Sequence, residues 1–127
     1  MPFTACHDQL IALFDQQNFA ACEQQAAKQV AAHPQDAFAW KTLGAVRQMQ
    51  GKLELAAPAM QQACTLWPDH AQNWNNYGNL LKQQRKLTEA EASYRRALAL
   101  DASSPDIHNN LGVVLKDLGR FAEAEAC

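Results

Sequence analysis

Two pairs of neighbouring asparagines, Asn75-Asn76 and Asn109-Asn110, lie 34 residues apart in the chain. An amide side chain both donates and accepts hydrogen bonds. A row of amides along one surface could therefore bind the backbone of an extended peptide, with little regard to the peptide's sequence. Asparagine is a moderate to poor helix former, so two pairs in phase indicate a role beyond helix stability. The other interpretations are that duplication carried the asparagines along, or that they cap and bridge neighbouring helices.

Residues able to catalyse a reaction or bind a metal are present but do not form a recognisable site. The four cysteines lack a C-x-x-C pair and metal-ligand spacing, and Cys22 is expected to be a buried thiol. No serine or threonine has a recognisable base partner, and no glycine-rich phosphate loop occurs. Glu123 and Glu125 are two residues apart on an expected helix, so they point in different directions. The histidines are spread along the chain, as His7, His33, His70 and His108. We expect no catalytic residue, metal or cofactor in this segment, although a longer parent protein could carry an enzyme.

The charge balance argues against nucleic acid as a partner. The formal net charge is −2, from 11 basic and 13 acidic residues, whereas nucleic-acid binding needs clustered Lys and Arg. The nearest approach to such a cluster is interpreted as a solvated helix face: Lys82, Arg85, Lys86, Arg95 and Arg96. No apolar run reaches the roughly 18 residues of a membrane span, and the first residues lack the pattern of a secretion signal. The sequence therefore predicts a cytoplasmic protein without a membrane partner.

The elements that would position the asparagines follow from an internal repeat. Gly44, Gly78 and Gly112 are each 34 residues apart, and similar segments precede them: Trp40-Lys-Thr-Leu, Trp74-Asn-Asn-Tyr and His108-Asn-Asn-Leu. Such a period indicates a stacked array of helical hairpins, and an array is typical of binding surfaces. The units run over residues 3–36, 37–70 and 71–104, followed by a truncated unit at 105–127.

Residue size within the unit predicts where its two helices cross. Small residues recur at the eighth position, as the three glycines, and at the twentieth position, as Cys22, Ala56, Ala90 and Ala124. Large residues at the fourth, seventh, eleventh and seventeenth positions would fill the space beside the crossing. The first helix should cover roughly the first fourteen positions, and the second should cover about positions 18 to 30.

Local signals mark the helix ends. Thr88 and Glu91 have the spacing of a capping box, in which Thr88 caps a helix and Glu91 binds the cap amide. Ser104 is the expected N-cap of the next helix, with Pro105 at its first position.

The turns between paired helices carry glycine in two units. Gly51 and Gly119 suit the left-handed backbone of a helix C-terminus. Arg85 occupies this place in the third unit, so we expect a strained or different turn there. Pro58 should fall within about the first turn of its helix, where proline is tolerated.

The pattern resembles the tetratricopeptide repeat (TPR) family, whose signature is this period together with the Trp-x-x-Leu-Gly segment. The matching residues are Trp40 to Gly44, Trp74 to Gly78, Ala56, Ala63, Ala90, Ala97 and Pro68. The first unit departs from the pattern, with Leu10 and Gln29 in place of small residues. The resemblance implies an all-α fold, a right-handed α-solenoid of helix-turn-helix hairpins, forming a single TPR domain over residues 1–127.

The resemblance also implies a binding site. In TPR proteins the first helix of each unit lines a concave groove, with its second, fifth, sixth, ninth, twelfth and thirteenth positions facing the ligand. The chain would then be a scaffold that binds a protein or an extended peptide. The candidate groove residues are Lys41, Gln48, Asn75, Asn76, Asn79, Lys82, Asn109, Asn110 and Lys116.

Two narrower family resemblances suggest particular functions. Asn76 and Asn110 are similar to the groove asparagines of O-linked N-acetylglucosamine transferases, and the chain looks like the N-terminal TPR arm of bacterial glycosyltransferases and sulfotransferases. Such an arm would recruit substrates for a longer enzyme. Lys41, Asn76 and Asn110 also fit part of the co-chaperone clamp for a C-terminal carboxylate. Ala45 and Asp106 stand where that clamp requires Asn and Lys, and Asp106 would repel a carboxylate.

The sequence stops inside the expected second helix of the fourth unit, at Cys127. Solenoids normally end in a repeat with a polar outer face. We therefore expect a fragment of a longer array, whose open apolar edge pairs with another copy of the chain. A self-associating structural module without a peptide ligand is the remaining alternative.

Overall fold

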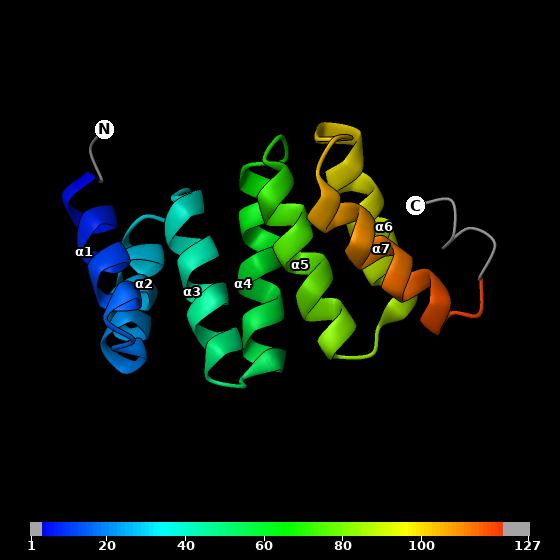
Figure 1. Ribbon diagram of the computed structural model, residues 1–127. Helices are drawn as coiled ribbons and strands as arrows, with labels where there is room; N and C mark the ends of the chain where they lie inside the picture. The colour runs from blue at the N-terminus through cyan, green and yellow to red at the C-terminus, as the bar shows by residue number, and fades with distance from the viewer. Residues whose placement is uncertain (1–3, 121–127) are drawn as a thin grey trace. The chain divides into compact units, whose positions relative to one another are not determined.

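A computed structural model describes residues 4–120, all of whose regular elements are α-helices (Figure 1). The helices are α1 (Thr4–Asp15), α2 (Phe19–Ala32), α3 (Ala37–Met49), α4 (Leu53–Leu66), α5 (Ala71–Gln83), α6 (Leu87–Leu100) and α7 (Pro105–Asp117). The predicted pairs of helices are confirmed, and each second helix begins one position earlier than expected. The expectations for Glu123, Ala124, Glu125, Cys127 and the helix that would contain them lie outside the described residues.

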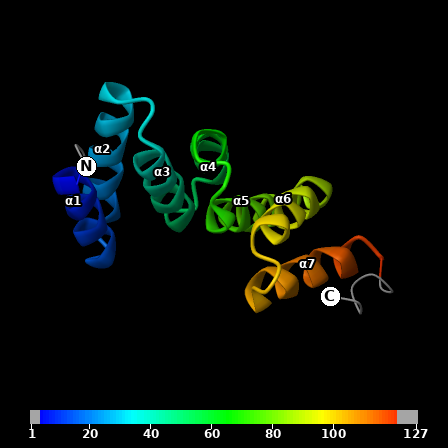
Figure 2. The same ribbon diagram turned by 90° about the horizontal axis from the view of Figure 1, so that it is seen from above.

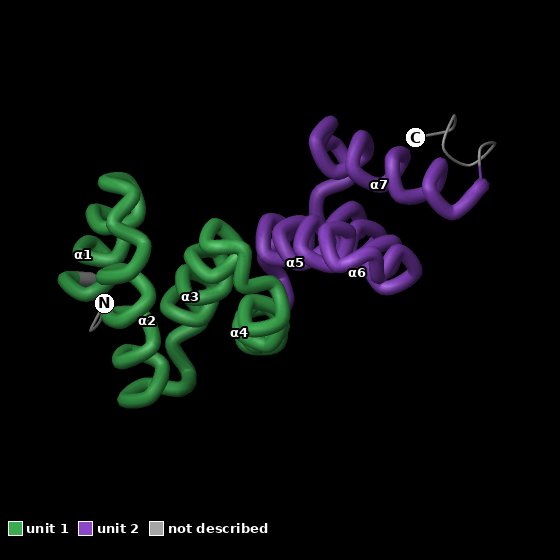
Figure 3. Tube along the Cα trace, turned by 90° about the horizontal axis from the view of Figure 1, so that it is seen from below, with its two compact units in different colours: residues 1–67 green, residues 68–127 purple. Residues whose placement is uncertain are grey.

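The chain divides into two compact units, residues 1–67 and 68–127 (Figure 3). In the first unit, α1 packs on α2 and α3, α2 packs on α3, and α3 forms a hairpin with α4 (Figure 2). In the second unit, α5 forms a hairpin with α6, and α7 packs on both of them. The first helices of consecutive repeats therefore contact each other inside each unit, as α1 with α3 and as α5 with α7.

Glycine at the eighth position allows the two helices of a hairpin to cross closely, as the repeat predicted. A Cβ atom on Gly44 would lie 2.6 Å from Cγ of Met60, and one on Gly78 would lie 2.7 Å from Cε1 of Tyr94. In the first repeat the large and small residues at this crossing are exchanged. There, Leu10 and Ala26 occupy the corresponding positions, both fully buried in one core cluster. Large and small residues thus exchange places across the crossing while the volume is filled.

The residue four positions before each of the repeated glycines is hydrogen-bonded to the turn that precedes its helix. The indole Nε1 of Trp40 donates to the Pro34 carbonyl at 2.8 Å, and that of Trp74 donates to the Pro68 carbonyl at 2.8 Å. His108 replaces tryptophan in the fourth repeat, and its Nε2 donates to the Ala102 carbonyl at 2.8 Å. Each ring nitrogen therefore ties a helix to the turn that leads into it.

The turns that follow α1, α3, α5 and α7 share one hydrogen bond, from the second residue after the helix cap back across five residues. The donor and acceptor pairs are Asn18–Leu13, Lys52–Arg47, Lys86–Leu81 and Arg120–Leu115. This is the Schellman arrangement, which requires a left-handed residue. Gly51 and Gly119 supply it as predicted, with φ of 78° and 81°. Gln17 and Arg85 adopt it with φ of 58° and 63°, so the Arg85 turn has the ordinary shape with a strained residue.

The starts of α7 and α6 differ in how well the sequence predicted them. Ser104 is confirmed as the N-cap of α7, since its hydroxyl accepts from the Ile107 amide at 3.4 Å. The capping box at Thr88 is wrong, because α6 begins at Leu87 with Lys86 as its cap. Glu91 instead accepts from Arg95 at 2.9 Å and from Arg120 at 2.6 Å. Two guanidinium donors bind a carboxylate more strongly than one backbone amide does.

A similar ion pair occurs two repeats earlier in the chain, at Glu23. Glu23 stands at the same repeat position and accepts from Lys52 at 2.9 Å and from Arg47 at 3.3 Å. The hydrogen bond from Lys52 is the main cause that lowers the pKa of Glu23, with a further contribution from Arg47. Lys52 and Arg120 occupy equivalent turns, so each pair ties the second helix of one repeat to the turn of the next.

The expected place of Pro58 in the first turn of its helix is also wrong. Pro58 is the sixth residue of α4, which continues without interruption from Leu53 to Leu66. The missing amide leaves the Glu54 carbonyl without its helical donor. Pro58 is exposed, so water can satisfy that carbonyl.

Candidate functional site

The first helices of the first unit enclose a groove of about 330 Å³. Helix α1 contributes Leu10, Ile11, Phe14 and Asp15, and helix α3 contributes Phe38, Lys41, Thr42 and Ala45. We call this the α1–α3 pocket. Leu10 is fully buried at its base, whereas Ile11 remains 45% exposed. The pocket is mostly apolar, and Lys41 and Asp15 are the charged residues that line it.

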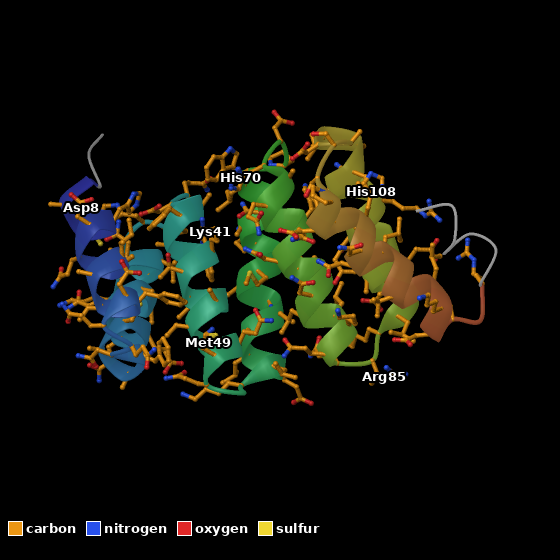
Figure 4. All side chains as sticks on the ribbon, viewed as in Figure 1. Asp8, Lys41, Met49, His70, Arg85 and His108 are labelled. Carbon is orange, nitrogen blue, oxygen red and sulfur yellow. The ribbon has the colours of Figure 1, made fainter. Side chains whose placement is uncertain are left out.

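Lys41 lies on α3 (Figure 4), where its ammonium group is 5.2 Å from the centroid of the Phe38 ring. This is within the distance of a cation–π interaction. Burial lowers the pKa of Lys41, because the charged form loses hydration. Lys41 thus presents a partly desolvated positive charge beside an apolar surface.

The Phe38 wall of the pocket is held from behind by a buried polar cluster. The His7 ring packs on the Phe38 ring with centroids 4.4 Å apart. His7 Nε2 in turn lies 2.8 Å and 3.0 Å from the two carboxylate oxygens of Asp36. Asp36 also accepts from Gln29 at 2.9 Å and from the Ala39 amide at 3.3 Å, which caps α3. One carboxylate therefore joins α1, α2 and the start of α3.

The electrostatics of Asp36 favour its charged form. Asp36 is only 4% exposed, and this burial by itself raises the pKa of its carboxyl group. The hydrogen bonds from His7, Gln29 and Ala39 outweigh that effect, so the pKa of Asp36 is lowered overall.

The predicted asparagine row lies on α5 and α7 of the second unit, and its members already make internal contacts. Asn110 Nδ2 donates to Asn75 Oδ1 at 3.0 Å, and Asn75 is only 5% exposed. Asn76 accepts from Gln72 at 2.9 Å. Asn79 accepts from the buried Tyr94 hydroxyl, whose pKa is raised by burial. The bridging role considered for these amides thus holds for Asn75 and Asn110.

The remaining predicted groove residues are distributed between the two units. Lys41 and Gln48 lie on α3, where both are half-buried. Lys82 is half-buried on α5, while Asn109 and Lys116 are exposed on α7. The structure brings Asn75 and Asn110 together, and it places Lys41 in the α1–α3 pocket.

Sequence reasoning missed the α1 side of this pocket. Ile11, Phe14 and Asp15 occupy the ninth, twelfth and thirteenth positions of the first repeat, which are groove positions in the TPR pattern. Applying that register to the weakly matching first repeat would have identified them. Apolar Ile11 and Phe14 at outward positions were the available signal.

The described chain offers no arrangement for metal chemistry. Among residues 4–120, no three His, Cys, Asp or Glu side chains are placed to share a metal ion. Cys22 and Cys64 are buried thiols, as expected for Cys22, and burial raises the pKa of Cys22. Within the same residues, every helix is too short or too polar to cross a bilayer.

Comparison with protein families identifies TPR sequences over most of the chain. The family described as "Tetratricopeptide repeat" matches residues 7–71, and that described as "TPR repeat" matches residues 78–119. No curated protein sequence matches the chain significantly.

Solved structures share the fold at low sequence identity. A crystal structure of MamA is 17% identical with a TM-score of 0.91, over 95% of this chain and 71% of that one. MamA from Desulfovibrio magneticus RS-1 is 19% identical with a TM-score of 0.88, over 95% and 68%. The first TPR domain of Spaghetti (RPAP3), bound to the HSP90 peptide SRMEEVD, is 18% identical with a TM-score of 0.86, over 91% and 92%. The fold is an all-α TPR-like solenoid of sequential hairpins, and the chain belongs to the tetratricopeptide repeat family.

Proposed function

We propose that this chain binds an extended peptide segment of another protein on the surfaces formed by the first helices of its repeats. The α1–α3 pocket is the observation that carries the proposal, since it is a largely apolar groove at positions that face ligands in TPR proteins. Apolar pockets with a few polar groups are the usual form of binding sites. RPAP3, which has the same fold, is bound to a peptide in its solved structure.

The second unit offers a surface of different chemistry. Asn109 and Lys116 on α7 are exposed, and Lys82 on α5 is half-buried. These groups can hydrogen-bond a peptide backbone or pair with acidic side chains. Asn75 is excluded as a direct contact by its burial and by its bond with Asn110.

A terminal carboxylate clamp is not the mode that we propose. The clamp combines a lysine with an asparagine. Ala45, which lines the α1–α3 pocket, stands where the clamp requires that asparagine. The neighbouring groups at Lys41 are instead the Phe38 ring and apolar residues of α1. The pocket therefore suits a side chain better than a chain end.

A random-peptide display selection, followed by amide chemical-shift mapping of the selected peptides, tests the proposal. Shifts should concentrate on α1, α3, α5 and α7. Failure to select any peptide, or shifts confined to exposed faces of α2, α4 and α6, would contradict it. Light scattering of the same samples distinguishes peptide binding from self-association of the chain.

A further inference from the structure

We propose that the α1–α3 pocket is an anchor site for one large apolar side chain of an extended peptide, whose adjacent residue is acidic and pairs with Lys41. This inference rests on the proposed function and specifies the class of ligand.

The pocket has room and an apolar lining for a large side chain. Its volume of about 330 Å³ is near the lower end of the range for ligand sites. Phe14 and Phe38 supply apolar surface above the buried Leu10, and Ile11 keeps 45% of its area exposed. An aromatic or large aliphatic side chain entering the pocket would cover that exposed surface and gain the free energy of apolar burial.

The walls of the pocket are supported before any ligand arrives. Phe38 is backed by the His7 ring, and His7 is held by Asp36. Thr42, which lines the same wall, donates its hydroxyl to the Phe38 carbonyl at 2.9 Å. Ordering these side chains therefore costs a ligand little of its binding free energy.

The charges at the pocket select the neighbour of the apolar anchor. Among residues 4–120, no carboxylate forms a salt bridge with Lys41. A partly desolvated ammonium group attracts a carboxylate more strongly than a fully hydrated one does. Asp15 is exposed at the end of α1, where it disfavours a second acid on that side. An acidic residue beside the anchor is thus favoured near Lys41 and disfavoured near Asp15, which gives the peptide a preferred direction.

A defined peptide tests this inference directly. The probe is used in two orders, Gly-Ser-Glu-Phe-Gln-Ser-Gly and Gly-Ser-Gln-Phe-Glu-Ser-Gly, each acetylated and amidated so that no terminal carboxylate is present. Each is titrated into the full chain and followed by amide chemical shifts, and one order should bind more tightly than the other. The largest shifts should fall in α1 and α3 around Ile11, Phe14, Lys41 and Ala45. Replacing the peptide's Phe by Ala should weaken binding by about tenfold or more. Replacing the Glu of the tighter-binding peptide by Lys should also weaken binding, and raised salt should reduce the difference.

Protein variants separate the pocket from the rest of the surface. Ala45→Trp should fill the pocket, and Lys41→Gln should remove the preference for Glu over Gln in the peptide. Lys28→Gln, at an exposed lysine on α2, is the matched control and should change neither property. If Ala45→Trp loses its helical circular dichroism, Ile11→Gln, at a half-exposed position, replaces it in the test.

The outcomes distinguish the inference from the proposed function. If display-selected peptides bind the first helices but bind Ala45→Trp, Ile11→Gln and Lys41→Gln as tightly as the wild type, the anchor pocket is wrong and the proposed function stands. If the defined peptide binds without dependence on its Phe, the anchor pocket is also wrong. If no peptide binds at all, both proposals fail.

Discussion

Asn110 on α7 donates its side-chain amide to the side-chain oxygen of Asn75 on α5, at 3.0 Å. The bond joins the first helices of two consecutive repeats within one unit, and the acceptor is only 5% exposed. Two members of the asparagine pattern therefore bind each other. Any ligand contact on this surface is left to the other exposed or half-exposed polar groups, such as Asn76 and Asn109.

Asn110→Ala should destabilise the fold by about 1–2 kcal/mol, because it leaves the buried Asn75 oxygen without its donor. Asn109→Ala is the matched control, at an exposed neighbouring position, and should change stability by less than about 0.5 kcal/mol. Urea denaturation measures both values. Equal effects of the two substitutions would show that the Asn75–Asn110 bond contributes nothing to stability.

Gly78→Leu should destabilise the second unit by about 1–3 kcal/mol, since its Cβ alone would lie 2.7 Å from the Tyr94 ring. Adding Tyr94→Ala should recover part of the loss, because the pair then matches Leu10 and Ala26 of the first repeat. A double-mutant cycle by urea denaturation measures this coupling. Strictly additive losses would contradict the exchange of large and small residues.

Arg85→Gly should stabilise the chain by up to about 1 kcal/mol, because glycine adopts φ of 63° without the clash of a side chain. Its ion pair with Asp117, at 3.7 Å and largely exposed, contributes little. Gly51→Ala, at φ of 78° in the equivalent turn, should have the opposite effect. Thermal unfolding measures whether each variant is more or less stable than the wild type. A loss of stability in Arg85→Gly would contradict backbone strain at Arg85.

Acid should weaken the fold partly through Asp36. Its pKa is lowered in the folded chain, so its contribution is present above the unfolded carboxyl pKa of about 3.9 and is lost as pH falls through the folded pKa. Urea denaturation at a series of pH values should therefore show a steeper decline below about pH 4 in the wild type than in Asp36→Asn. Parallel curves for the two proteins would mean that Asp36 is not stabilised in its charged form.

The fold could be predicted from the sequence because the information is local and repeated. The glycines at 44 and 78, the small residues at position twenty and the Ser104 cap each specify a contact within one hairpin or at one helix end. Repetition in phase made each signal reinforce the others. The Arg85 turn was expected to be strained or different in shape; it keeps the common shape, and Arg85 adopts the left-handed backbone at a cost in strain.

Contacts between repeats were harder to predict from the sequence than contacts within one repeat. Glu91 had the spacing of a local cap, yet it binds Arg120, which is 29 residues further along the chain. Asn75 meets Asn110, although they occupy different positions in their repeats. The α1–α3 pocket depends on which side chains of two helices meet, and its α1 half lies in the repeat that matches the pattern least well. Periodicity indicates which positions face a neighbouring helix, but not which side chains will pair there.

Peptide binding to the first helices is tested most directly by amide chemical-shift mapping of a display-selected peptide on the full chain. We expect saturable shifts on α1 and α3 around the α1–α3 pocket, with further shifts on α5 and α7. Saturable binding with unchanged resonances on all four of these helices would contradict the account.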